Sequence, residues 1–198
     1  MWDADWNGKM ATVHGFWPSG SAKNYLDCFG YQGDQNCMKD AFAFDYSLLG
    51  MDTRRKMDIH WPEYGNKNCG DFYQYEWDKH GTCYLMNMIE DHKDEYQKDN
   101  KKFNETIFVE YFENVMNKVE ERNISLKSGT TYQTKDDFAK DIGLKSSQFR
   151  VKCSRDNEVD EFQICYTRVA KPGDEVLMDC PQDYSSEGDC YGKPFVIK

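Results

Sequence analysis

The chain has 198 residues, of which 39% are hydrophobic and 15% aromatic, and its formal net charge is −10. This length suffices for one domain with a hydrophobic core, and no hydrophobic run is long enough to span a membrane. The acidic balance, with a pI near 4.9, argues against tight and extended nucleic-acid binding, which favours basic surfaces. We expect a single domain over residues 1–198 and no membrane partner.

The first informative segment lies near the start of the sequence. Ala11–His14 has the pattern of a strand end, and Gly15 followed by Trp17-Pro18 predicts a turn. The turn follows because the residue before a proline avoids the helical region. His14 is one of only four histidines in the chain, and we expect it at the end of a core strand.

A second segment follows a loop predicted over Pro62–Gly70. A helix over residues 73–83 would place Glu76, Lys79 and His80 on one face, because side chains three and four positions apart are neighbours on a helix. A strand end that carries a histidine and faces such a helix would form a two-sided cleft.

These residue types together indicate a particular chemistry. Phosphoryl transfer from a 2′-hydroxyl without a metal needs two imidazoles, one that removes the hydroxyl proton and one that protonates the leaving oxygen. A cation offsets the charge that builds on the phosphate oxygens. His14 and His80, with Glu76 and Lys79, supply these groups. The plain alternative is that Glu76 and His80 form an ordinary side-chain contact.

The middle of the chain predicts helices. Residues 84–103 are highly charged and indicate a solvated helix and a loop. Residues 105–122 predict an amphipathic helix whose apolar stripe belongs to the core. That stripe consists of Phe108, Tyr111, Phe112, Val115 and Val119. A further helix over 135–142 would begin at Thr134 as N-cap, with Asp137 at the third position.

The last third of the chain predicts strands. Alternation over Gln148–Cys153 and Glu161–Tyr166 indicates antiparallel strands, joined by a turn at Asp156–Glu158. Residues 181–193 predict a loop. The fold class that follows is α+β, with a central antiparallel sheet flanked by helices in a single disulfide-bonded domain.

Eight cysteines in a chain of this size indicate an oxidising compartment, and no C-x-x-C pair suggests zinc. Spacing alone leaves their connectivity open. Asn104 and Asn123 stand in Asn-x-Thr and Asn-x-Ser triplets, which have the form of glycosylation acceptors.

The two histidine segments resemble the active-site signatures of the ribonuclease T2 family of acid, base-non-specific endoribonucleases. The family's His-Gly-Leu-Trp-Pro corresponds to His14–Pro18. Its Phe-Trp-x-His-Glu-Trp-x-Lys-His-Gly-Thr-Cys corresponds to Phe72–Cys83. The resemblance extends more loosely through Leu126–Gly129, Tyr132 and Cys180-Pro181.

The resemblance implies an endoribonuclease that cleaves single-stranded RNA, and not DNA, to 2′,3′-cyclic phosphates without metal or cofactor. His80 would be the general base on the 2′-hydroxyl and His14 the general acid toward the departing 5′-oxygen. Glu76 and Lys79 would stabilise the phosphorane, and Trp17 would stack on a base. We expect a monomer that is secreted or works in a lysosome- or vacuole-like compartment, where acid charges the histidines.

Two departures from the family pattern stand out. Tyr75 occupies the position of a family histidine, and a tyrosine can bind a phosphate oxygen but cannot carry positive charge. We therefore expect weakened activity or an altered pH dependence. The family's N-terminal strand segment is expected to be missing ahead of His14. The resemblance implies the disulfides Cys37–Cys83, Cys153–Cys190 and Cys165–Cys180, and leaves Cys28 and Cys69 unassigned.

The same residues allow three other functions. A metal-dependent hydrolase could use both motif histidines and Glu76 as ligands, although Lys79 on the same face would repel the ion. A catalytically weakened member of the family could act as a secreted binding or cytotoxic protein, which Tyr75 would explain. A cysteine protease built on Cys83 is disfavoured, because a disulfide is expected there.

Overall fold

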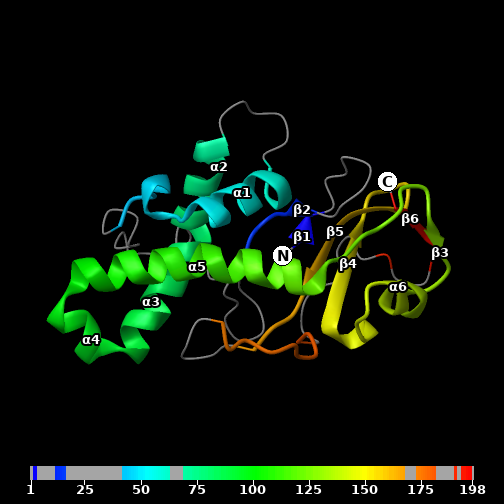
Figure 1. Ribbon diagram of the computed structural model, residues 1–198. Coiled ribbons are helices and arrows are strands. Elements are labelled where there is room, and N and C mark those ends of the chain that lie inside the picture. Colours follow the sequence, from blue (N-terminus) through cyan, green and yellow to red (C-terminus); the bar gives the residue numbers. More distant parts are fainter. Residues whose placement is uncertain are drawn as a thin grey trace. The chain divides into compact units, whose positions relative to one another are not determined.

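The computed structural model describes residues 2–3, 12–16, 42–62, 69–167, 173–181, 190 and 193–197. The chain divides into two compact units. The first comprises Met1–His14, Lys118–Thr167 and Glu175–Lys198, and the second comprises Gly15–Asn117 and Arg168–Asp174. One division therefore falls between His14 and Gly15, and another falls within the long helix α5 (Figure 1).

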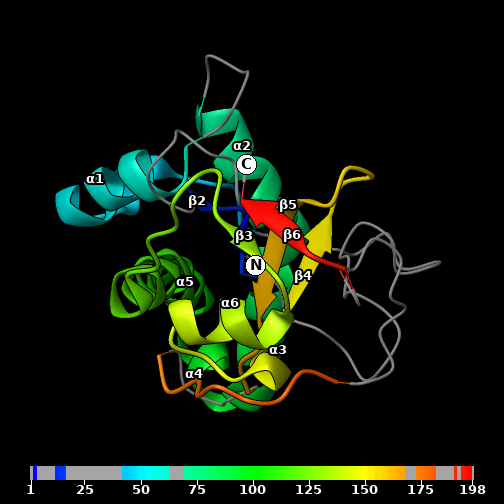
Figure 2. The ribbon, with the colours of Figure 1, turned by 90° about the vertical axis from the view of Figure 1, so that its right-hand side faces the viewer.

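The first unit contains a sheet, which has six strands in the described part of the chain. The strands are β1 (Trp2–Asp3), β2 (Thr12–Val13), β3 (Thr131–Tyr132), β4 (Phe149–Cys153), β5 (Glu158–Ile164) and β6 (Phe195–Ile197). β5 pairs with β4, β1 and β6, and Figure 2 shows β4, β5 and β6 side by side. The expected antiparallel pairing is confirmed for β4–β5, β1–β5, β1–β2 and β3–β6, whereas β5 and β6 run parallel.

Phenylalanine rings form the core of this unit. The ring of Phe138, on helix α6 (Lys135–Asp141), contacts rings from three strands, Phe149, Phe162 and Phe195, at centroid distances of 5.5, 5.8 and 5.7 Å. The predicted start of α6 is confirmed, because the side chain of Thr134 accepts a hydrogen bond from the amide of Asp137 at 3.2 Å. The cap thus fixes where the helix meets the sheet.

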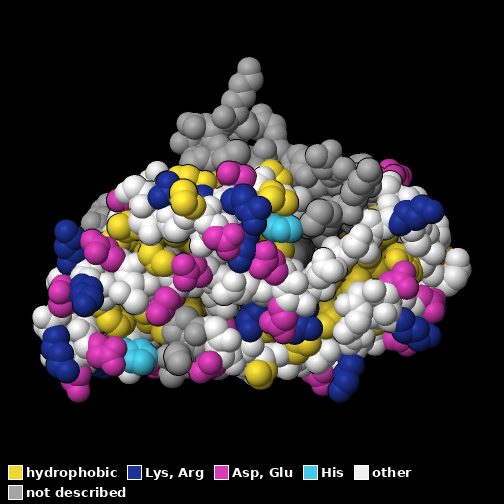
Figure 3. Space-filling view, in the orientation of Figure 1, with side chains coloured by type: hydrophobic (Ala, Val, Ile, Leu, Met, Phe, Trp, Pro, Cys, Tyr) yellow, Lys and Arg dark blue, Asp and Glu magenta, His cyan; other side chains and the backbone are white. Residues whose placement is uncertain are grey.

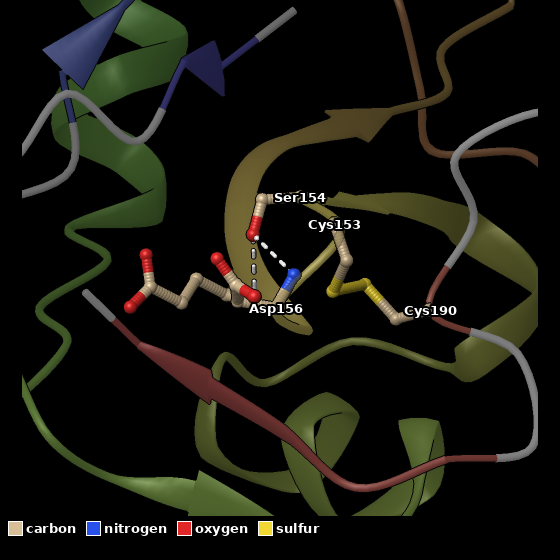
Figure 4. Close-up of a disulfide and its surroundings, with 5 residues drawn as sticks. Cys153, Ser154, Asp156 and Cys190 are labelled. Carbon is tan, nitrogen blue, oxygen red and sulfur yellow. Dashed lines mark hydrogen bonds between the residues drawn. A yellow bond between two sulfur atoms is a disulfide. The ribbon is translucent and has the colours of Figure 1, made fainter.

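The turn between β4 and β5 is closed by a side chain. The hydroxyl of Ser154 accepts hydrogen bonds from the amides of Asp156 and Glu158 at 3.2 and 3.3 Å (Figure 4). Asn157 has a φ of +59°, a conformation that asparagine tolerates. Because the turn ends at Asn157, β5 begins at Glu158, three residues before the predicted strand.

Two disulfides belong to this unit. Cys153 at the end of β4 is bonded to Cys190, next to the Ser154 turn (Figure 4). Cys165, directly after β5, is bonded to Cys180. These are the two late pairs that the family resemblance implies.

The second unit is helical. It contains α1 (Met51–His60), α2 (Cys69–Glu76), the π-helix η3 (Trp77–Gly81), α3 (Thr82–Asp91), α4 (Lys93–Lys98) and most of α5 (Asn100–Arg122). Short 3₁₀ turns occur at Tyr46–Leu48 here and at Ser146–Gln148 in the first unit. Among the described helices, none has the length and apolar composition needed to cross a membrane.

Aromatic side chains fill the core of the second unit. The predicted apolar stripe of α5 is confirmed, because all five of its residues are buried. The ring of Phe108 lies 4.8 Å from that of Trp77, centroid to centroid. The prediction that residues 84–103 are solvated is wrong for their first part, since Tyr84, Leu85 and Met88 are buried on α3. The segment contains so many charged residues that its sequence pattern does not reveal the apolar face.

Candidate active site

The helical segment that carries Glu76 and His80 changes its winding between them. α2 ends at Glu76, and the next five residues, Trp77–Gly81, form a π-helix. The amide of Thr82 donates to the carbonyl of Trp77, five residues back. The prediction of a helix over residues 73–83 is confirmed, but the wider turn was not predicted. Single π turns within α-helices occur frequently at functional sites.

Gly81 and Trp77 account for this local geometry. A Cβ atom on Gly81 would lie 2.1 Å from Cε3 of the Trp77 ring, so no side chain fits there. The indole N–H of Trp77 donates to the carbonyl of Phe42 at 2.9 Å, which fixes the ring. Thr82 Oγ1 donates to the carbonyl of Asp78 at 2.8 Å. The π turn is therefore built around a tryptophan packed on a glycine.

Glu76 and His80 form a buried pair. Their side chains are 1% and 2% exposed, and Glu76 Oε2 lies 4.0 Å from His80 Nε2. Burying a carboxylate is costly unless charged or hydrogen-bonding groups compensate. A carboxylate at this distance favours the protonated imidazole and can stabilise it during proton transfer. The plain alternative, an ordinary side-chain contact between Glu76 and His80, is not decided by this geometry.

Lys79 lies in a more exposed environment with Tyr75. Its ammonium group donates to the hydroxyl of Tyr75 at 3.1 Å and lies 5.3 Å from the centroid of the tyrosine ring. Tyr75 is 49% exposed. The pair presents a cation and a hydroxyl at the surface of the same helical segment, and cation–π contact favours this placement.

Tyr111 on α5 contacts the π turn through the ring of Trp77, whereas its sequence pattern indicates only a core position. Its hydroxyl donates to the carbonyl of Phe16 at 2.9 Å, and the residue is fully buried. Burial, and then the charge of Glu76, raise the pKa of Tyr111 well above its usual value. The phenol therefore keeps its proton to higher pH than a free tyrosine does, and donates it to Phe16. The sequence holds one signal for this contact, which is that the residue is a tyrosine, because a buried tyrosine hydroxyl needs a hydrogen-bond partner.

The first motif is described only in part. β2 ends at Val13, so His14 directly follows a strand, as predicted, and is half-buried. Trp17 and Cys37 lie outside the described residues. Cys83 is disulfide-bonded, which leaves no thiol there for a cysteine protease. Its predicted bond to Cys37 stays a prediction.

The two candidate glycosylation sites differ in burial. Asn104 lies within α5 and is only 6% exposed, which leaves no room for a glycan. The expectation at Asn104 is therefore corrected, because helix packing covers its amide. Asn123 is exposed immediately after α5, with a φ of +43°. Glycosylation at Asn123 stays a prediction.

On the face shown in Figure 3, acidic and basic side chains are interspersed and do not gather into one patch. Within the described ranges, no group of three or more His, Cys, Asp or Glu side chains is arranged to hold a metal ion. This face therefore offers no extended basic track for a nucleic-acid backbone.

A known structure shares the fold. A crystal structure of Actibind, described as a T2 ribonuclease, aligns with a TM-score of 0.52 at 16% sequence identity. The alignment covers 87% of this chain and 73% of Actibind. At this identity the likeness concerns the fold alone.

Sequence comparison gives the family. The nematode protein "Ribonuclease T2 protein rnst-2" from Caenorhabditis elegans is 25% identical over 173 residues, which cover 87% of this chain and 56% of that protein. Ribonuclease DdI from Dictyostelium discoideum is 24% identical over 180 residues, which cover 89% of this chain and 70% of the relative. The chain thus spans little more than half the length of the nematode relative. The profile of the Ribonuclease T2 family matches residues 4–180, and the chain belongs to this family.

Proposed function

We propose that this protein is an endoribonuclease that cleaves single-stranded RNA by metal-free transphosphorylation. The observation that carries the proposal is the buried pair of Glu76 and His80, 4.0 Å apart across a π turn. Membership in the ribonuclease T2 family supports the same activity. The products are 2′,3′-cyclic phosphates, because the 2′-hydroxyl is the internal nucleophile.

In this mechanism His80 removes the proton from the 2′-hydroxyl, and the carboxylate of Glu76 stabilises the imidazolium that forms. His14 protonates the departing 5′-oxygen. General acid–base groups of this kind contribute about 10²–10⁴-fold each. The support for His14 is its place in the first signature, at the end of strand β2.

The phosphate is bound by Lys79 and Tyr75, which are more exposed than Glu76 and His80. Lys79 offsets negative charge on the phosphorane, and Tyr75 adds one hydrogen bond through its hydroxyl. Their contact at 3.1 Å keeps the two groups together. Trp17 stacks on a base without selecting among bases, which suits broad sequence preference.

A second function is favoured by Tyr75. The position directly before Glu76 lacks the positive charge that a family histidine would bring, and the tyrosine is 49% exposed. A weakened enzyme that acts as a secreted binding or cytotoxic protein would retain its biological effect when both motif histidines are replaced. We propose secretion or an acidic, lysosome-like compartment in either case, which the disulfides favour.

The test is cleavage of single-stranded RNA between about pH 4 and pH 8, with and without a chelator, and with single-stranded DNA as second substrate. The wild-type protein, His14→Ala, His80→Ala and His92→Ala are compared. His92 is the matched control, because it also pairs with a glutamate, Glu95, at 3.7 Å, but in a partly exposed position.

We expect chelator-insensitive cleavage of RNA only, lost in the two motif variants and retained in His92→Ala. Loss of activity with the chelator would instead indicate a metal-dependent hydrolase. Absence of cleavage at every pH, from a correctly oxidised protein, would contradict the proposal and leave the binding function.

A further inference from the structure

We propose that Tyr111 is a positioning residue for the reaction. It anchors the chain just after His14 to Trp77 and Tyr84, the two aromatic side chains that its own ring contacts. The proposal deepens the proposed function and rests on it, because it assigns to Tyr111 the placement of the segment that carries the general acid. Tyr111 touches no reacting atom in this account and acts through Phe16.

Phe16 is held in two ways. Its carbonyl accepts the hydrogen bond from Tyr111 at 2.9 Å. Its ring makes edge contacts with Tyr111 and Tyr84, at centroid distances of 6.4 and 6.3 Å. The backbone of Phe16 is thus held by Tyr111 on α5, and its ring contacts both Tyr111 and Tyr84 on α3.

The same tyrosine contacts the second motif. The Tyr111 ring packs edge-on against Trp77, the residue that shapes the π turn, at 5.5 Å. It also lies 5.6 Å from the ring of Tyr84. The charge of Glu76 acts on the phenol, which supports their proximity. One buried side chain therefore contacts both the segment after His14 and the helix of Glu76.

The link to His14 follows from chain geometry. Only Gly15 lies between His14 and Phe16, and two extended residue steps reach at most roughly 7 Å. Fixing the carbonyl of Phe16 therefore limits the freedom of the chain directly after His14. Misplacement of a catalytic group by about 1 Å can cost on the order of 10²-fold in rate.

The test compares Tyr111→Phe with Tyr132→Phe. Tyr132 is also a buried tyrosine, and its hydroxyl donates to Asp141 Oδ2 at 2.6 Å, within the first unit. Each variant keeps its ring and loses one buried hydroxyl. We expect Tyr111→Phe to lower kcat about 10-fold with KM changed less than about 2-fold, because orientation is lost and not binding. For Tyr132→Phe we expect wild-type kcat and KM.

A second measurement does not depend on RNA. Hydrogen–deuterium exchange at the amides of residues 14–16 should accelerate about 10-fold in Tyr111→Phe, since the local anchor is gone, and should not change in Tyr132→Phe. If the wild-type protein cleaves no RNA, the proposed function fails, and exchange still decides whether Tyr111 anchors this segment.

Three results would overturn the proposal. The first is an unchanged kcat in Tyr111→Phe, and the second is a fall in kcat without faster exchange. The third is an unfolded Tyr111→Phe beside a folded Tyr132→Phe, which would make the hydroxyl a stability element only.

Discussion

The carboxylate of Glu76 and the imidazole of His80 lie 4.0 Å apart with both side chains almost completely buried, Glu76 at the end of α2 and His80 within the π turn of Trp77–Gly81. In a buried site a charge acts more strongly on its neighbours than it does in water. The pair is thus suited to stabilise positive charge on the imidazole at the moment of proton transfer.

Replacing Glu76 by glutamine tests this role, because the shape is kept and the charge is lost. We expect kcat for RNA cleavage to fall about 10²-fold. Glu95→Gln is the control, since it removes the carboxylate of the partly exposed pair of His92 and Glu95. Equal activity of Glu76→Gln and wild type in steady-state assays would show that the charge is not used.

Gly81→Ala tests whether the π turn depends on close packing. The new methyl group would clash with the Trp77 ring at 2.1 Å, so the ring or the turn must move. We expect a loss of about 1–3 kcal/mol in the free energy of unfolding, measured by urea denaturation, and reduced activity. At Gly50 the nearest atom to an added Cβ is 4.0 Å away, so Gly50→Ala is the control. Similar stability of the two variants would contradict this account of the turn.

Tyr75→His restores the residue that the family pattern has at this position. A histidine adds a second positive charge beside Lys79 at acid pH and can still donate a hydrogen bond. We expect kcat/KM to rise about 10-fold below about pH 6 and little change above about pH 7.5, where imidazole is neutral. Tyr75→Phe, which loses the hydrogen bond from Lys79, should lower kcat/KM. A pH–rate profile that does not respond to Tyr75→His would show that this position is not near the phosphate.

Stability should fall at alkaline pH. Burial raises the pKa of Tyr111, Tyr132 and Tyr166, and a hydrogen bond to Asp141 adds to the rise at Tyr132. The folded state then holds phenolic protons that the unfolded state releases near pH 10. The stabilisation is complete below about pH 10 and is lost as the pH rises above it.

Urea unfolding at about pH 8 and about pH 11 measures this effect. Tyr132→Phe should reduce the alkaline loss by about 1 kcal/mol. An equal loss in the variant and in the wild type would show that Tyr132 does not contribute.

Much of the fold could be predicted from pattern. The stripe of α5, the Thr134 cap and the strand β4 have clear periodicity or cap chemistry, and the structure has them. Helix α1 was missed, because its sequence is mostly charged and buries only Thr53 and Met57. Strand β6 was missed because it is three residues long and pairs with residues far away in the sequence.

The sequence indicates the two motifs, but it does not indicate every turn and contact around them. Motif spacing placed Glu76 and His80 on one helical segment, and the structure has them as a buried pair. The π turn was not predictable by periodicity, since it depends on the contact between Trp77 and Gly81. The part played by Tyr111 depends on its hydrogen bond to Phe16, 95 residues away in the sequence, which periodicity on one helix cannot indicate.

The central claim, that a 2′-hydroxyl of the substrate is the nucleophile, is tested most directly with an oligoribonucleotide that carries one 2′-O-methyl group. The wild-type protein is incubated with this strand and with its unmodified twin, and the product ends are identified by mass spectrometry. The account predicts 2′,3′-cyclic phosphate ends at every cleaved bond and no cleavage directly after the methylated nucleotide. Cleavage at that bond would contradict it, because the nucleophile would then have to be water.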